Sequence, residues 1–127
     1  MYNLSMIKID HFYIKVTDLK EAIDFYEQLL SSKISNREGD RWADFENKTD
    51  VYFGILNTTI DNETFNVGDN VTLSLKTDEI EQEHNRISNL NPKTITEVFT
   101  IKQPALYKYF QFEDKWGNIW EVSQYDY

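Results

Sequence analysis

The chain contains no cysteine among its 127 residues. That absence excludes disulfide bonds, thiolate metal sites and a cysteine nucleophile. Glycine is also scarce, with 4 copies that stand alone in turns or strands, so no glycine-rich phosphate loop is present. No stretch approaches the roughly 20 apolar residues of a membrane-spanning helix, and the first residues lack the apolar core of a secretory signal. We therefore expect a cytoplasmic protein that does not bind membranes.

The chain is also poor in positively charged residues. Lysine and arginine number 13 against 22 aspartates and glutamates, which gives a formal net charge of -9. A protein of this sign repels phosphate groups, so we expect no binding to nucleic acid or to anionic membrane surfaces. The acidic balance is compatible with a cationic or neutral small ligand, although solubility alone also explains it.

Apolar and aromatic residues are plentiful by comparison, at 40% and 15% of the chain. A chain of this length and composition can bury a core of its own. We predict a single domain over residues 1–127, made of a first module at about 6–56, a connection at 57–69 and a second module at about 70–127.

The first module reads as a strand, a helix and three strands. Residues 7–16 alternate, with Phe12 on one face and His11 on the other. Asp18 and Glu21 form a capping box at the start of a helix that extends to Leu30. Three shorter strands are predicted at 33–37, 41–46 and 51–56.

The same order recurs 61 residues later. Residues 71–77 form a strand pattern in which Leu73 takes the place of Phe12, and Ile80 and Ile87 repeat the helical spacing. Three more strands are predicted at 94–99, 107–113 and 119–124. The sequence thus predicts an α+β fold with two tandem βαβββ modules that form a curved mixed sheet, with a helix on one face and a polar, concave face opposite.

Two motifs resemble the vicinal oxygen chelate superfamily, which groups glyoxalases, bleomycin-resistance proteins and extradiol dioxygenases. They are IDHFYIKVTDLKEAIDFYEQLL at residues 9–30 and FQFEDKWGNIWEV at residues 110–122. Lys115 stands where the closing motif usually has proline. The resemblance implies a glyoxalase-like cup and a homodimer in which modules of two chains complete each cup. The fold serves lyases, isomerases, oxygenases, thiol transferases and drug-binding proteins, so it does not by itself define a function.

The resemblance also implies a place for a divalent metal. Members that bind metal take a histidine or glutamine from the first strand of a module and a glutamate from the last, which points here to His11 and Glu121. Thr72 stands at the second histidine position, and residues 51–56 contain no carboxylate. Because catalytic metal sites usually have at least three protein ligands, zinc, nickel, manganese or iron would need a further ligand, such as Glu113, Gln111 or the substrate. No cofactor is certain.

Each candidate residue also has a structural explanation. His11 can be a hydrogen-bonded residue of the pocket wall, and Glu121, the candidate catalytic residue, can be a carboxylate paired with a cation or a backbone N–H. His84 on the second helix is interpreted as a partly buried residue without a catalytic role. The density of aromatic residues favours a flat or cationic ligand. The residues expected to bind it are Tyr13, Trp42, Phe53, Thr72, Tyr109, Gln111 and Ser123.

Three functions remain open at this point. The first is binding of a small organic molecule in the cup without catalysis. The second is a metal-dependent lyase or isomerase of the glyoxalase type, in which His11 and Glu121 hold the ion. The third is a non-catalytic structural or regulatory dimer.

Overall fold

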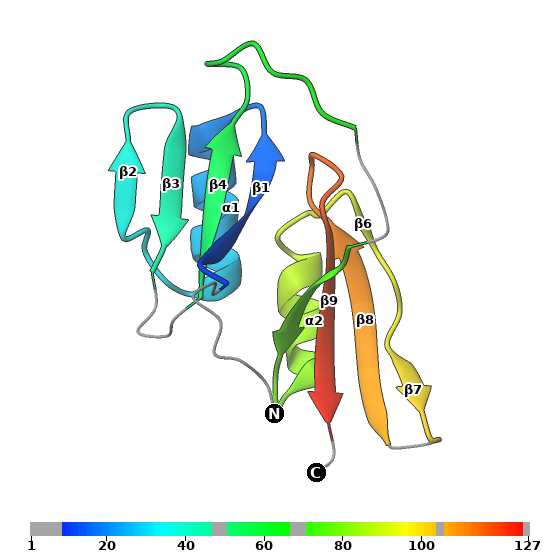
Figure 1. Ribbon diagram of the computed structural model, residues 1–127. Helices are drawn as coiled ribbons and strands as arrows, with labels where there is room; N and C mark the ends of the chain where they lie inside the picture. The colour runs from blue at the N-terminus through cyan, green and yellow to red at the C-terminus, as the bar shows by residue number, and fades with distance from the viewer. Residues whose placement is uncertain (1–8, 47–50, 67–70, 104–105, 126–127) are drawn as a thin grey trace, which may run out of the picture. The chain divides into compact units, whose positions relative to one another are not determined.

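The protein was analysed as a computed structural model that describes residues 9–46, 51–66, 71–103 and 106–125 (Figure 1). The chain divides into two compact units, Met1–Thr64 and Phe65–Tyr127, and the division falls inside the connection predicted at 57–69. Each unit contains one helix and one mixed sheet.

Unit 1 is a four-stranded sheet in the order β1-β4-β3-β2. Strand β1 runs parallel to β4, and the other neighbours are antiparallel. The elements are β1 (His11–Val16), α1 (Leu19–Leu30), β2 (Asn36–Glu38), β3 (Trp42–Phe45) and β4 (Tyr52–Asn57).

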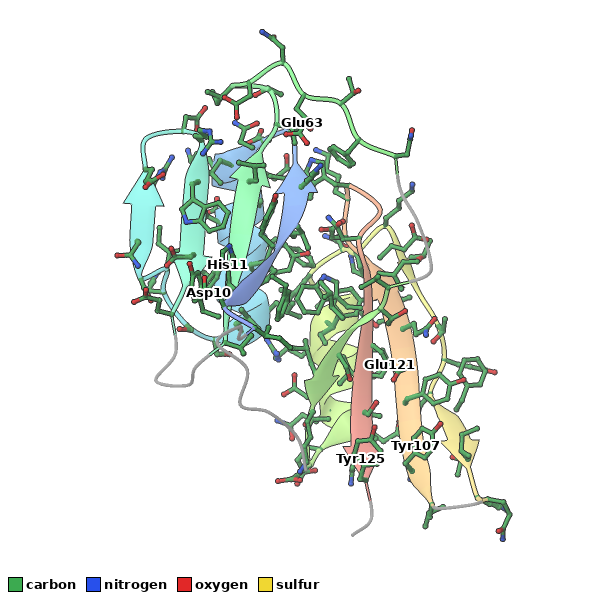
Figure 2. All side chains as sticks on the ribbon, viewed as in Figure 1. Asp10, His11, Glu63, Tyr107, Glu121 and Tyr125 are labelled. Carbon is green, nitrogen blue, oxygen red and sulfur yellow. The ribbon has the colours of Figure 1, made fainter. Side chains whose placement is uncertain are left out.

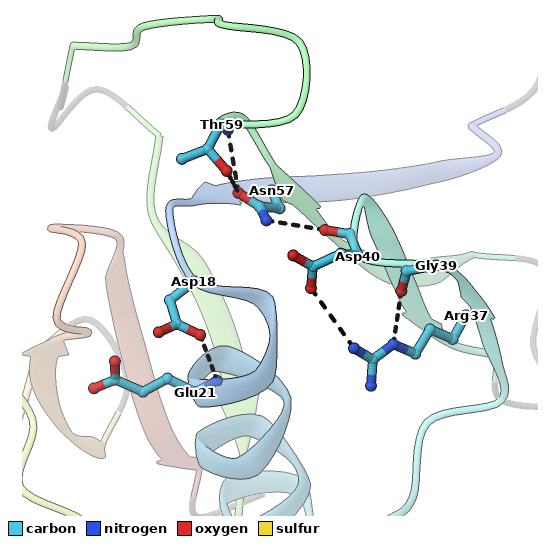
Figure 3. A network of polar contacts seen from close by, with 7 residues as sticks. All are labelled: Asp18, Glu21, Arg37, Gly39, Asp40, Asn57 and Thr59. Atoms are coloured by element: carbon cyan, nitrogen blue, oxygen red, sulfur yellow. Dashed lines mark hydrogen bonds and ion pairs between the residues drawn. The ribbon is translucent and has the colours of Figure 1, made fainter.

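Helix α1 begins and ends where the sequence predicts. The side chain of Asp18 accepts a hydrogen bond from the backbone N–H of Glu21 at 3.0 Å (Figure 3), which satisfies one of the exposed donors of the first turn. Ser31 ends the helix in a left-handed conformation with φ 50°. The buried stripe of the helix repeats at helical spacing and packs against β3 and β4.

The core of unit 1 lies between α1 and one face of the sheet. Burial of each large apolar side chain there contributes about 1.5–3 kcal/mol. The helix supplies Leu19, Ala22, Ile23, Tyr26 and Leu29, and the strands supply Ile14, Val16, Ala43, Phe45, Phe53 and Ile55.

The segment after β4 is tied back to unit 1 by polar contacts. Asn57 donates to the carbonyl of Asp40 at 2.9 Å, and its side-chain oxygen accepts from Thr59 (Figure 3). Lys15 of β1 pairs with Glu63 at 2.5 Å, and Glu63 is marked in Figure 2. These contacts hold the first part of the predicted connection against unit 1.

Unit 2 repeats the plan with one more strand. Its sheet has the order β5-β9-β8-β6, and β7 also pairs with β8. The elements are β5 (Leu73–Lys76), α2 (Ile80–Ser88), β6 (Thr94–Ile95), β7 (Phe99–Ile101), β8 (Tyr107–Glu113) and β9 (Ile119–Tyr125). Helix α2 packs against β8 and β9, and the buried residues on that side include Phe110, Phe112, Trp120 and Val122.

The prediction of a single strand at 94–99 is wrong, because the structure has two separate strands, β6 and β7. At the break, the Thr96 hydroxyl accepts from the backbone N–H of Gln111 at 3.0 Å. The Thr96 carbonyl is 2.8 Å from Nε2 of His84 on α2. The side chains of Thr96 and His84 thus replace regular ladder contacts, and His84 has the structural position expected of it.

The β8–β9 turn is built around Asp114, which is fully buried. One carboxylate oxygen accepts from the backbone N–H groups of Trp116 and Asn118, at 2.9 and 2.8 Å, and the other accepts from the Asn118 amide at 2.8 Å. Gly117 has φ 90°, a conformation that favours glycine. The turn fixes the register in which Glu121 pairs with Gln111.

Among the described residues, no helix is long and apolar enough to cross a bilayer. The α+β class and the two βαβββ modules predicted from the sequence are confirmed.

A close contact in unit 1 sets the shape of the sheet face opposite α1. Gly54 lies in the middle of β4, where a Cβ atom would overlap the six-membered ring of Trp42 on β3. The indole of Trp42 therefore lies directly over the backbone of Gly54, and only glycine permits that approach.

We expect Gly54→Ala to lower the free energy of unfolding by about 1–3 kcal/mol, because the added methyl group must displace the indole. The measurement is urea denaturation. In a Trp42→Ala background the same change should cost much less, since the obstructing ring is gone.

Gly39→Ala is the matched control. Gly39 has φ 54° and no atom within 4 Å of an added Cβ, so its cost of roughly 1 kcal/mol comes from the backbone and should be the same in both backgrounds. An equal cost of Gly54→Ala with and without Trp42 would contradict the packing described here.

Candidate functional site

Four rings gather on the face of the unit 1 sheet opposite α1. His11 stacks on Tyr52, with ring centroids 4.6 Å apart and planes 11° apart. Trp42 meets His11 edge-on at 5.7 Å and 82°, and meets Tyr13 at 5.6 Å and 70°. Strand pairing explains the cluster, because His11 is in register with Tyr52, and Tyr13 with Gly54. We call the rings of His11, Tyr13, Trp42 and Tyr52 the aromatic cluster.

A buried carboxylate lies beside the aromatic cluster. Asp44 on β3 is 5% exposed, and one of its oxygens accepts from the Trp42 indole N–H at 2.9 Å. The other oxygen accepts from the side-chain amide of Asn36 on β2 at 2.8 Å. Burial of a carboxylate is costly unless it is hydrogen-bonded, and these two donors satisfy Asp44.

These residues line a groove with a volume of about 550 Å³. That volume falls within the range of roughly 300–1,000 Å³ that is typical of small-molecule sites. We call it the aromatic groove. Its lining residues are His11, Asn36, Arg37, Glu38, Trp42, Asp44 and Tyr52.

The electrostatics of the groove are dominated by negative charge. Desolvation raises the pKa of Tyr52 above its ordinary value of 10.0, and the charges of Asp10, Asp44 and Glu46 raise it further. Asp10 also contacts His11, with its carboxylate 2.5 Å from Nδ1 (Figure 2). A neutral His11 in this arrangement donates from Nδ1 to Asp10 and leaves Nε2 as an acceptor.

Unit 2 has a different, more polar face opposite α2. Glu121 on β9 accepts from the side-chain amide of Gln111 on β8 and from the hydroxyl of Ser123, each at 3.3 Å. Ser74 on β5 is in register with Glu121. Both hydrogen-bond donors to Glu121 are neutral, so this carboxylate is oriented by the sheet without a salt bridge among the described contacts.

Tyrosines follow Glu121 along the same face. Tyr107 and Tyr125 form a cross-strand pair with centroids 5.4 Å apart (Figure 2). The ring centroid of Tyr109 lies 5.9 Å from that of Tyr107 and 5.5 Å from that of Phe99 on β7. This row of rings gives unit 2 its own aromatic surface.

The structure places most of the predicted site residues on these two faces. In unit 1 they are His11, Tyr13 and Trp42, and in unit 2 they are Tyr109, Gln111, Glu121 and Ser123.

Two predicted residues lie elsewhere. Phe53 is 7% exposed and contacts Tyr26 of α1, so it belongs to the core on the opposite side of the sheet. Thr72 precedes β5 and is exposed, and the β5 residue beside Glu121 is Ser74.

Sequence reasoning missed Tyr52, Asp44 and Gly54. Alternation along residues 51–56 puts Tyr52 and Phe53 on opposite faces of the strand, so the prediction that Phe53 binds the ligand excluded Tyr52. The role of Asp44 depends on strand pairing with Asn36, and the role of Gly54 depends on the ring of Trp42, so neither has a signal in the local sequence.

Register explains why unit 1 offers no second glutamate. Phe12 pairs with Phe53 on β4, and Leu73, 61 residues after Phe12, pairs with Trp120 on β9. The next residues, Gly54 and Glu121, therefore occupy matching positions in the two units. Trp42 fills the space that a side chain at Gly54 would need, so a metal ligand cannot be accommodated there.

Within the described parts of the chain, no group of three or more histidine, aspartate or glutamate side chains is arranged to hold a metal ion. His11 belongs to unit 1 and Glu121 to unit 2. The two candidate ligands are therefore presented by different units, as the resemblance to metal-binding members implies.

Comparison with solved structures shows what the fold is similar to. A glyoxalase/bleomycin resistance protein from Albidiferax ferrireducens T118 matches with 19% identity and a TM-score of 0.74, over 94% of this chain and 99% of that one. The hypothetical protein SA1046 from S. aureus matches with 20% identity and a TM-score of 0.73, over 94% and 95%. A lactoylglutathione lyase from Agrobacterium tumefaciens matches with 14% identity and a TM-score of 0.70, over 95% of both chains. No curated protein matches the sequence.

The sequence itself matches a family. Residues 8–122 fit the Glyoxalase/Bleomycin resistance protein/Dioxygenase superfamily, which covers both motifs quoted above and both βαβββ modules. The chain belongs to the glyoxalase/bleomycin resistance protein/dioxygenase superfamily.

Proposed function

We propose that this protein binds a small organic molecule with a flat or compact apolar part in the aromatic groove of unit 1. The observation that carries the proposal is the groove of about 550 Å³ walled by His11, Trp42 and Tyr52, with the buried carboxylate of Asp44 beside them. Ligand sites are typically concave, mostly apolar and furnished with a few fixed polar groups. The proposal includes no chemical step.

The architecture of the groove favours a preformed site. Trp42 is held from three directions, by the backbone of Gly54, by the hydrogen bond to Asp44 and by the edge contact with His11. A ring fixed in this way loses little conformational entropy when a ligand binds, so more of the contact energy contributes to affinity.

A metal-dependent lyase or isomerase is the second candidate. The observation in its favour is the contact between Asp10 and Nδ1 of His11 at 2.5 Å. A carboxylate in this position fixes the imidazole so that Nε2 can bind a metal, an arrangement common around histidine ligands. Glu121 would be the second ligand, and oxygens of the substrate would complete the coordination of zinc, nickel, manganese or iron.

A homodimer is compatible with both candidates. In such a dimer, the first module of one chain would meet the second module of its partner, so that His11 and Glu121 of one site would come from different chains. A structural or regulatory dimer without a ligand is the third candidate.

The binding proposal predicts quenching of tryptophan fluorescence when small aromatic molecules are added to the full chain. Trp42→Ala should weaken binding about tenfold when measured by calorimetry, because it removes a stacking surface worth about 1.4 kcal/mol. Tyr107→Leu, which removes an aromatic ring from unit 2, is the matched control and should leave the affinity unchanged. No response across a broad panel of neutral and charged aromatic molecules would favour the third candidate.

The metal proposal makes a separate prediction. Protein purified without chelator should contain stoichiometric metal, and calorimetry should lose the binding signal in both His11→Ala and Glu121→Gln, because each change removes one of the two protein ligands that would hold the ion. Ser74→Ala, beside Glu121 in unit 2, is the control. If no metal binds at millimolar concentration, the lyase candidate is excluded.

A further inference from the structure

We infer that the ligand of the aromatic groove is an organic cation with a weakly hydrated charge, of the quaternary ammonium class, bound against the Trp42 indole. The inference rests on the binding function proposed above and specifies the chemistry of its ligand. It draws on the orientation of the rings, the position of the carboxylates and the contacts of Arg37 in the lining.

The rings present their faces in two directions. Trp42 lies over Gly54, so a ligand in the groove contacts the part of the indole that faces away from this backbone. The His11 ring stacks on Tyr52, and its plane makes an angle of 82° with the plane of the Trp42 ring. Aromatic faces carry partial negative charge, and two surfaces at a right angle can surround a compact cationic head.

The buried carboxylate strengthens this preference. The indole N–H of Trp42 donates to Asp44 at 2.9 Å, and a hydrogen bond to a charged acceptor polarises the donor group. The indole becomes more electron-rich, so its face attracts a cation more strongly. Because Asp44 is only 5% exposed, water screens its charge poorly.

Further carboxylates surround the rings. Glu38 is in register with Trp42 and lines the groove. Asp10 contacts His11, and the charges of Asp10 and Glu46 act on Tyr52 together with Asp44. The groove thus has an excess of negative charge around it, which attracts cations and repels anions.

Arg37 also lines the groove, and its charge is engaged by other groups of unit 1. Its Nε donates to the carbonyl of Gly39 at 2.8 Å, and a terminal nitrogen lies 3.7 Å from Asp40 (Figure 3). These contacts hold the guanidinium at the β2–β3 turn and offset its charge there.

The hydrogen bonds of Asp44 favour an alkylated cation over a primary ammonium ion. Each carboxylate oxygen already accepts one hydrogen bond, from Asn36 or from Trp42, which leaves less of its accepting capacity for the N–H groups of a ligand. A primary ammonium would give up strong hydration in the groove and would gain few hydrogen bonds in return. A quaternary ammonium has no N–H group to satisfy and gains from aromatic contact.

The test compares three probes of similar shape by calorimetry on the full chain. They are (3-hydroxyphenyl)trimethylammonium, its neutral isostere 3-tert-butylphenol, and protonated 3-hydroxybenzylamine. We expect the trimethylammonium probe to bind about tenfold more tightly than the neutral isostere, the amount expected of a cation–π contact in a partly desolvated site. It should also bind more tightly than the primary ammonium.

Substitutions of groove carboxylates test whether these residues cause the preference for the cation. Asp44→Asn keeps an acceptor for the Trp42 N–H, and rotation of the Asn36 amide can satisfy the new NH₂ group, so the fold should survive. The preference for the cation should fall about fivefold or more when this carboxylate is neutralised. Asp24→Asn, an identical change on the exposed side of α1, should leave the preference intact. Glu38→Gln provides a second groove variant should Asp44→Asn fail to fold.

The outcomes separate this inference from the function on which it rests. Equal affinity for the cation and its neutral isostere, with both lost in Trp42→Ala, would overturn the charge preference and leave the binding function standing. Equal affinity for the quaternary and primary ammonium probes would overturn the assignment to the quaternary class. If none of the three probes binds at millimolar concentration and the aromatic panel is also silent, both proposals fail.

Discussion

The approach of the Trp42 indole to Gly54 is the constraint on which the unit 1 face depends. Because the ring covers β4, it fills the position that Glu121 occupies in unit 2, and a buried carboxylate is found instead at Asp44 on the neighbouring strand. The same contact fixes the ring that His11 and Tyr13 meet in T-shaped contacts. Because Gly54 has no side chain, aromatic rings can cover this face of the sheet. The buried acidic group of the face, Asp44, lies beside these rings.

The two βαβββ modules have sheets with matching strand order, apart from the additional strand of unit 2, and different chemistry. Unit 1 combines rings with a buried, fully hydrogen-bonded carboxylate, whereas unit 2 presents Glu121 held by the neutral donors Gln111 and Ser123. A hydrogen-bonded carboxylate on each face is compatible with ligand binding and with acid–base or metal chemistry. The two faces differ in the residues that surround this carboxylate. The superfamily fold therefore defines where a ligand can be bound, and the side chains of each face define which kind.

Much of the fold was predictable from the sequence, because period-2 and period-3.6 patterns report which face of an element is buried. The Asp18 cap, the span of α1 and the burial of Trp120 and Val122 all follow from such local signals. The break at Thr96 does not follow from local signals, because it depends on a hydrogen bond from His84 on another element. In the candidate site, alternation located His11 and Glu121, whereas Phe53 was assigned to the wrong face. The parts played by Asp44 and Gly54 arise only when β2, β3 and β4 pair.

The break between β6 and β7 has a consequence for the behaviour of the protein in solution. Together these strands form the outer border of the unit 2 sheet, where unpaired backbone groups can recruit a strand from another molecule. Segments of two and three residues, interrupted by side-chain contacts of Thr96, offer no long and regular ladder for that purpose. The irregularity that local sequence patterns could not reveal therefore protects this border against self-association into fibrils.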